Sequence, residues 1–101
     1  MEEEKMRKVV THEWDATKFL KTDEDIAGFI DAAIEEGDPD LLQHALGIAA
    51  KAKGMMKVSK ETGLSRGALY RALDKDGNPT LASFFKILKA LDLKMTIKPA
   101  N

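Results

Sequence analysis

The side chains with the most readily assigned chemistry lie in the stretch MMKVSKETGLSRGALYRALD, in the second half of the chain. The planar guanidinium of Arg66 can donate two hydrogen bonds to the two acceptors on the major-groove edge of guanine. Gly67 has no side chain, so the helix that carries it can approach another surface closely. Tyr70 and Arg71, one turn further on, can reach a base edge or the flanking phosphates. This combination indicates contact with double-stranded DNA.

Two short helices must position these side chains. The first is predicted over 55–62 and ends at Gly63, whose backbone can adopt the angle that closes a tight turn. The second begins at Ser65, whose hydroxyl can satisfy a free backbone N–H, and runs to about Leu73. The buried contacts expected to hold the pair at a steep angle are Val58, Leu64 and Leu69. This is the pattern of a helix-turn-helix, whose second helix enters the major groove.

Other polar residues stand near helix ends and in loops, where contacts with phosphates orient a protein on DNA without reading its sequence. The expected DNA-binding residues are, in full, Lys57, Lys60, Ser65, Arg66, Gly67, Tyr70, Arg71, Lys75, Asn78 and Thr80. The plainer alternative is that Arg66 and Arg71 are ordinary surface arginines and that Tyr70 packs against its neighbours.

Two longer helices are predicted in the first half of the chain. Thr22 and Asp25 have the spacing of a capping box, which starts a helix at about residue 23. Gly37 ends that helix, and Asp38 caps the next one, which has Pro39 at its first position. The residues expected to face inward repeat with helical spacing and are Ile26, Phe29, Ile30, Ala33, Ile34, Leu42, Ala45, Leu46 and Ala49.

A fifth helix is predicted after Thr80, which is expected to cap it. Its inward-facing residues are expected to be Leu81, Phe84, Phe85, Leu88 and Leu91. Residues 94–98 then alternate polar and apolar side chains, which is the period of a half-buried strand. Met95 and Ile97 would form the buried face of this strand, which could pair across the two-fold axis of a dimer. The alternative is a frayed tail.

The first residues, 1–21, show no helical period and are predicted to form a short extended arm. Its apolar anchors are Trp14, Phe19 and Leu20, which either fold back on the domain or dock on a protein partner. Residues 22–101 are predicted to form one all-α domain, with the helix-turn-helix unit at 55–74, because a chain of 101 residues and 11.1 kDa supports one small core.

Composition excludes several classes of function. Cysteine is absent, which excludes disulfide scaffolds and thiolate chemistry and fits a reducing, cytoplasmic compartment. No apolar run is long enough to span a membrane, and the acidic start MEEEKMRKVV is not expected to be a signal peptide. His12 and His44 have no partners at metal-ligand spacing. Without a nucleophile elbow, phosphate loop or zinc motif, we expect no enzyme activity, cofactor or metal.

The charge of the chain is divided unequally between its halves. Residues 1–50 hold thirteen acidic and five basic residues, a net charge of −8, whereas residues 51–101 hold four acidic and eleven basic residues, a net charge of +7. The second half would attract a polyanion, and the first half would attract a basic protein. The alternative is that the two halves pair with each other as solvated faces.

Residues 55–91 resemble the Cro/repressor (Xre-type) helix-turn-helix, and residues 14–98 as a whole resemble the HigA-like addiction-module antidote proteins. The most specific segments are EEGDP at 35–39, GLSRGALYRAL at 63–73 and GNPT at 77–80. The resemblance implies a five-helix, lambda-repressor-like fold. It also implies an antitoxin that binds its own operator as a homodimeric repressor and neutralises a small basic RelE/ParE-like toxin.

Two residues depart from the usual helix-turn-helix pattern. Ser59 stands where Ala is common, and Thr62 stands where an apolar residue is commoner. Both can be buried if their hydroxyls bond a backbone carbonyl. Two other functions stay open: a solitary prophage-type regulator without a toxin, and a protein-binding adaptor that keeps the helix-turn-helix shape without contacting DNA.

Overall fold

Local sequence signals determine where the first two long helices begin. In the computed structural model, which describes residues 16–74 and 77–100, the Thr22 hydroxyl accepts a hydrogen bond from the N–H of Asp25 at 3.0 Å. The Asp25 carboxylate accepts one from the N–H of Thr22 at 3.1 Å, which completes the predicted capping box. Gly37, at φ 71°, ends this helix in the left-handed conformation, and Asp38 caps the next one, as predicted.

Five α-helices and one 3₁₀ turn make up the regular structure of the described residues. They are η1 (Ala16–Lys18), α2 (Asp23–Glu36), α3 (Pro39–Lys53), α4 (Met55–Thr62), α5 (Arg66–Leu73) and α6 (Leu81–Ala90). The prediction of an all-α fold is therefore confirmed. The turn η1 lies inside the predicted extended arm, so that this part of the arm is helical instead.

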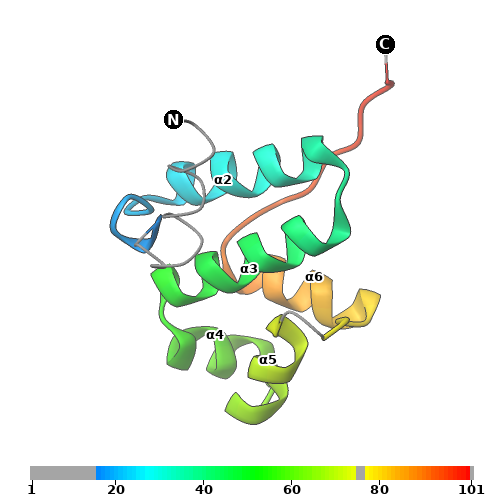
Figure 1. Ribbon diagram of the computed structural model, residues 1–101. Coiled ribbons are helices and arrows are strands. Elements are labelled where there is room, and N and C mark those ends of the chain that lie inside the picture. The colour runs from blue at the N-terminus through cyan, green and yellow to red at the C-terminus, as the bar shows by residue number, and fades with distance from the viewer. Residues whose placement is uncertain (1–15, 75–76, 101) are drawn as a thin grey trace, which may run out of the picture.

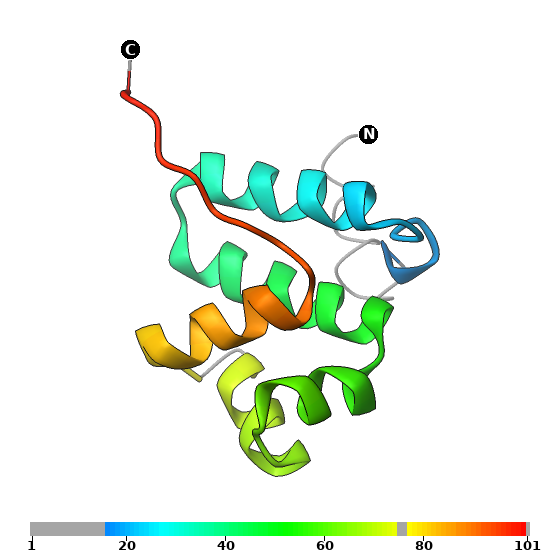
Figure 2. The ribbon, with the colours of Figure 1, turned by 180° about the vertical axis from the view of Figure 1, so that it is seen from behind.

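Helix α3 is the centre of the arrangement. It contacts α2 on one side and both α4 and α5 on the other, while α6 packs against α4. As a result α2 and α5 lie at opposite ends of the molecule, with α3 between them (Figure 1). The view from behind shows the segment after α6 running up past α3 and α2 (Figure 2).

The core draws side chains from all five α-helices. All but one of its most deeply buried large residues were predicted to be buried, and these are Ile26, Ile30, Leu46, Val58, Leu69, Leu88 and Leu91. The exception is Ile87, which was not among the predicted inward residues and is fully buried. Leu46 and Leu69 are at most 1% exposed, which places α3 and α5 on one shared core. Full burial of an aliphatic side chain contributes about 1.5–3 kcal/mol, so these residues fix how α5 sits on the domain.

The end of α6 is closed by a Schellman motif. The N–H of Leu93 donates to the carbonyl of Leu88 at 2.9 Å, and the N–H of Asp92 donates to the carbonyl of Lys89 at 3.0 Å. Asp92 has φ 61°, a left-handed conformation that glycine usually takes and that aspartate tolerates better than most residues. An aspartate therefore stands where the chain turns away from α6.

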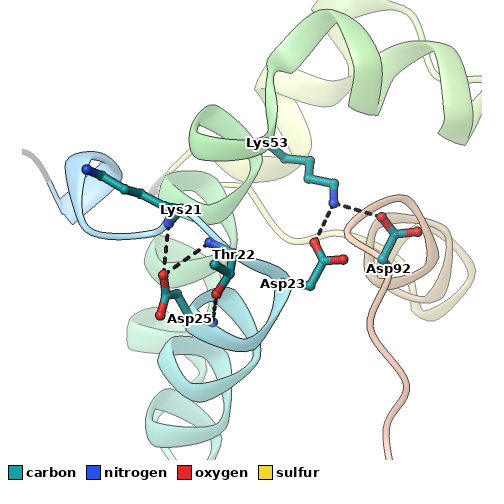
Figure 3. Close-up of polar contacts among 6 residues, drawn as sticks. All are labelled: Lys21, Thr22, Asp23, Asp25, Lys53 and Asp92. Atoms are coloured by element: carbon teal, nitrogen blue, oxygen red, sulfur yellow. Dashed lines mark hydrogen bonds and ion pairs between the residues drawn. The ribbon is translucent and has the colours of Figure 1, made fainter.

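The side chain of Asp92 joins two other segments through Lys53, at the end of α3 (Figure 3). The Lys53 ammonium lies 2.7 Å from the Asp92 carboxylate and 2.7 Å from that of Asp23, the first residue of α2. These hydrogen bonds raise the pKa of Lys53, with Asp23 contributing more than Asp92, and they lower the pKa of Asp92. One cation thus ties together the start of α2, the end of α3 and the end of α6.

The predicted C-terminal strand is wrong. Residues 94–98 adopt no regular structure, and Met95 and Ile97 are 40% and 91% exposed instead of forming a buried face. A strand needs a second extended segment to complete its ladder of hydrogen bonds, and residues 16–74 and 77–100 contain no β-strand.

Two residues of α6 were also expected to face inward and do not. Leu81 is 71% exposed and Phe85 is 50% exposed. The inward stripe of α6 consists of Phe84, Ile87, Leu88 and Leu91, which follow the spacing i, i+3, i+4, i+7. Leu81 and Phe85 lie at the edge of this stripe and remain on the surface.

Candidate nucleic-acid interface

The turn between α4 and α5 has the conformation that the sequence predicts. Gly63 adopts φ 79°, and its N–H donates to the carbonyl of Ser59 at 3.0 Å. The Ser65 hydroxyl then accepts a hydrogen bond from the N–H of Ala68 at 3.0 Å and so caps α5. Val58 and Leu69 are fully buried behind the turn. The start of α5 is therefore fixed by both a cap and a core anchor.

The two unusual hydroxyl residues of α4 hold this turn together. Ser59 donates from its hydroxyl to the carbonyl of Leu64 at 2.6 Å. Thr62, which is 6% exposed, donates to the carbonyl of Ser59 at 3.1 Å and accepts from the N–H of Leu64 at 3.1 Å. The expectation that both hydroxyls would bond the backbone is confirmed. They satisfy polar groups of the turn that an apolar residue would leave unpaired.

The outer face of α5 is open to solvent. Arg66, Gly67 and Arg71 are exposed, and Tyr70 is 47% exposed. Leu69, which is fully buried, points from the opposite side of the same helix into the core. The helix therefore presents two guanidinium groups and a phenol outward, a set of hydrogen-bond donors suited to base edges and phosphates.

The other predicted DNA-binding residues are exposed wherever the structure describes them. Lys57 and Lys60 are exposed on α4. Asn78 and Thr80 are exposed between α5 and α6, and the Thr80 hydroxyl caps α6 by accepting from the N–H of Ser83 at 3.1 Å. Lys75 lies outside the described residues. The exposed cations are thus carried by both helices of the pair.

The C-terminal end of α5 is held by a residue that the sequence analysis did not select. Gln43 of α3 is 9% exposed, and its side-chain amide donates to the carbonyl of Ala72 at 3.1 Å and also to that of Asp74. The last carbonyls of a helix have no partner within the helix, so this amide caps α5 from another element. One feature of the sequence could have indicated this role. Gln43 stands three residues before Leu46, on the helical face expected to be buried, where a polar side chain needs a hydrogen-bond partner.

Gly77 fits tightly against the same end of α5. Its N–H donates to the carbonyl of Asp74 at 2.8 Å. A Cβ atom at position 77 would lie 2.0 Å from the carbonyl oxygen of Arg71, which is far inside van der Waals contact. Residue 77 can occupy this position only because it has no side chain. Both ends of the exposed helix are therefore held in place.

Most acidic side chains of residues 16–50 lie on α2, the helix at the opposite end of the molecule from α5 (Figure 1). Between Thr22 and Ala50 the sequence holds eight Asp and Glu residues and no Lys or Arg. These residues belong to α2, the following turn and the start of α3, whereas α5 starts at the opposite end of the molecule (Figure 1). Six of the eight lie on α2, whereas Asp40 lines a groove together with Gly77 and Asn78, just beyond α5. The acidic charge of this segment is thus concentrated on α2.

The three predicted arm anchors do not form one surface in the described residues. Leu20 is 9% exposed and belongs to the core, so this residue folds back on the domain. Phe19 is 64% exposed. Trp14 lies outside the described residues. The sequence left open whether these residues fold back on the domain or dock on a protein partner, and Leu20 folds back on the domain.

Comparison with known proteins decides the family. Over residues 10–99 the chain matches the family described as probable addiction module antidote protein. The chain belongs to this family. An addiction module pairs an antidote with a toxin, so the predicted antitoxin role and the expectation of a toxin partner are confirmed at this level.

A relative extends the comparison. The antidote is 34% identical over 89 residues to an uncharacterized protein of Haemophilus influenzae, and the match covers 88% of this chain and 92% of the relative. No solved structure matches the chain. Within the part of the antidote that the structure describes, no helix is long and apolar enough to cross a membrane, and no cluster of three His, Asp or Glu side chains could hold a metal ion.

Proposed function

We propose that this antidote is a HigA-like, lambda-repressor-like DNA-binding protein that represses its own operon and neutralises a RelE/ParE-like toxin. In this proposal α4 and α5 are an Xre-type helix-turn-helix, spanning residues 55–74 within a DNA-binding domain at 22–101. Residues 1–21 precede the domain as an arm. The cytoplasm, where operator DNA and toxin are both found, is the proposed location.

One observation carries the DNA-binding part of the proposal. Arg66 and Arg71 are exposed on one side of α5, while Leu69 is fully buried on the other. A short helix anchored from behind, with cations in front, can be inserted into the major groove without any rearrangement of the domain. Arg66, in the first turn, is proposed to read a guanine, and Arg71 with Tyr70 is proposed to contact a base edge or the backbone.

The phosphate contacts are proposed to come from the residues around this helix. Lys57 and Lys60 on α4, with Lys75, Asn78 and Thr80 beyond α5, would orient the domain on the duplex. Ser65 and Gly67, at the start of α5, would allow the helix N-terminus to approach a phosphate closely. Because such contacts release counterions, binding should weaken steeply with rising salt.

The toxin is proposed to bind the acidic end of the molecule. A RelE/ParE-like toxin is a small basic protein, and the eight acidic residues between Thr22 and Ala50 offer it a complementary surface. Phe19, which precedes α2 and is 64% exposed, and Trp14 of the arm are proposed as apolar anchors of that contact. Since α2 and α5 lie at opposite ends, toxin and DNA could be bound together (Figure 1).

The test is co-expression of the antidote with the product of the adjacent gene. The proposal predicts a basic protein of about 100 residues, toxic by itself, that co-purifies with the tagged antidote. Replacing Glu35 and Glu36, both exposed on α2, together by Lys should weaken that complex, whereas the same charge reversal on α4, Glu61→Lys, should leave it intact. A neighbour that is not toxic, or that does not bind, would favour a solitary regulator.

A further inference from the structure

Two large apolar side chains on α6 are left uncovered. Leu81 is 71% exposed and Phe85 is 50% exposed, one helical turn apart on the same face. Phe85 is held in position by an edge-on contact with the ring of Phe84, with the ring centroids 5.8 Å apart. Phe84 in turn packs against the core. The ring of Phe85 is therefore connected to the core through Phe84.

A shallow groove lies directly beside this pair. It runs between the start of α3 and the start of α6, and Leu81 forms part of its wall. The apolar lining comes from Pro39, Leu42, Leu46, Pro79, Leu81 and Phe84, and Asp40 and Asn78 add polar groups. A protruding apolar pair and an apolar groove thus occur side by side on one flank of the domain.

We propose that this flank, made of the groove and of Leu81 and Phe85, is where two copies of the antidote associate. The inference rests on the proposed function in one respect, because a repressor of a palindromic operator must be a dimer. It replaces the C-terminal residues Met95 and Ile97 as the dimer surface.

A second copy fits this flank better than a different protein does. Across a two-fold axis the same surface of each copy faces that of the other. Leu81 and Phe85 of one copy can therefore enter the groove of the second copy, while the corresponding pair of the second copy enters the groove of the first. The charges are complementary in the same way. Asp38 and Asp40 are exposed at the start of α3, and Lys86 and Lys89 are exposed on α6 next to Phe85. The two-fold would set the acidic edge of each copy near the basic helix of the other.

The position of the flank relative to α5 also favours a dimer. The first turns of α3 and α6 lie on one side of the molecule, whereas α5 starts at its lower end in Figure 1. A two-fold axis beside the flank, directed from α2 toward α5, leaves both copies of α5 uncovered on the same face. By contrast, the C-terminal tail leaves the domain near α2, at the end away from α5 (Figures 1 and 2). A dimer built on Ile97 would hold the two copies of α5 far apart.

The experiment is sedimentation equilibrium on the full chain without DNA or toxin. Wild type should reach twice the chain mass of 11.1 kDa with rising concentration. The double variant Leu81→Glu, Phe85→Glu should stay monomeric over the same range, with a dissociation constant raised at least about 100-fold by four like charges at the centre of the contact. The matched control is Ile97→Glu, which places the same charge on a 91% exposed apolar residue and should still dimerise.

Circular dichroism of each variant checks that the helices are kept. If the double Glu variant loses helical signal, a double Ala variant with Leu81→Ala and Phe85→Ala is used in its place. This variant should also weaken the dimer, with a dissociation constant raised by about tenfold or more. A wild type that stays monomeric, a folded double variant that dimerises like wild type, or a dimer lost only in Ile97→Glu would each overturn the proposal. Because no DNA or toxin is present, these outcomes are independent of whether the antidote binds either one.

Discussion

The side-chain amide of Gln43 donates a hydrogen bond to the backbone carbonyl of Ala72, 3.1 Å away and 29 residues further along the chain. The same amide bonds the carbonyl of Asp74. Through this one side chain, α3 satisfies the last carbonyls of α5, and so the helix proposed to enter DNA is fastened to the centre of the domain at its C-terminal end. Leu69 and the Ser65 cap fasten the rest of it.

Gln43→Leu is expected to loosen the end of α5. The substitution keeps the approximate volume but removes the amide that bonds two part-buried carbonyls. The carbonyl of Asp74 still accepts from the N–H of Gly77, whereas that of Ala72 loses the partner that Gln43 supplies, which should lower the free energy of unfolding by about 1–3 kcal/mol. Urea denaturation followed by circular dichroism measures this loss. The neighbouring variant His44→Ala, at an exposed position of the same helix, should change stability by no more than about 0.5 kcal/mol. Equal stability of the two variants would show that the amide is not needed.

Substitution by alanine should change the stability of the folded chain differently at three glycines. Gly28, inside α2 with no atom within 4 Å of an added Cβ, should gain about 0.5–1 kcal/mol of stability as Ala. Gly63, at φ 79°, should lose about 1–2 kcal/mol because Ala is strained there. Gly77→Ala should be the most damaging, since its Cβ would overlap the carbonyl oxygen of Arg71. Thermal melts of the three variants give the order, and a Gly77→Ala variant as stable as wild type would contradict the close approach of Gly77 to Arg71.

The ion pair of Asp92 should make stability depend on pH in the acid range. Its pKa lies below the ordinary value of 3.8 because Lys53 donates a hydrogen bond to it. A carboxylate with a lowered pKa stabilises the folded chain above its unfolded pKa, and that contribution is lost as the pH falls through the folded value. Asp92→Asn keeps the tolerance for a left-handed backbone but removes the charge. The variant should therefore melt below wild type near neutral pH and match it once Asp92 is protonated.

Melting curves between about pH 7 and pH 2.5 measure this difference, with Asp31→Asn on the exposed face of α2 as the control. Lys53, whose pKa is raised, affects stability in the alkaline range. Its contribution is fully present below the ordinary lysine pKa of 10.5 and is lost as the pH rises through the raised pKa. A gap between wild type and Asp92→Asn that is the same at every pH would mean that the charge of Asp92 plays no part.

Much of the fold could be predicted from the sequence because its signals are local. Thr22, Asp38, Ser65 and Thr80 each cap the helix that follows, and a cap depends on a hydroxyl or carboxylate only two or three residues from its N–H partner. The outward face of α5 followed in the same way from the position of Leu69 within one short helix.

The errors concern contacts between distant segments or with another molecule. Alternation in residues 94–98 describes one face of a strand but does not supply the second strand that it needs. Leu81 and Phe85 are apolar at helical spacing, which does not distinguish a side chain facing the core from one facing a partner. Gln43 was missed because its partners, the carbonyls at the end of α5, are defined only once the helices have packed.

The most direct measurement titrates the antidote against the duplex upstream of its own gene and against a shuffled duplex of equal length, at one salt concentration. We predict that Arg66→Ala loses about 5- to 150-fold in preference for the upstream duplex, the equivalent of one base contact. Lys60→Ala, which removes a proposed phosphate contact, should weaken binding to both duplexes alike. The same titrations repeated at a second salt concentration should show a smaller salt dependence for this variant. An Arg66→Ala variant that discriminates between the two duplexes as well as wild type does would contradict the proposal that α5 reads the operator.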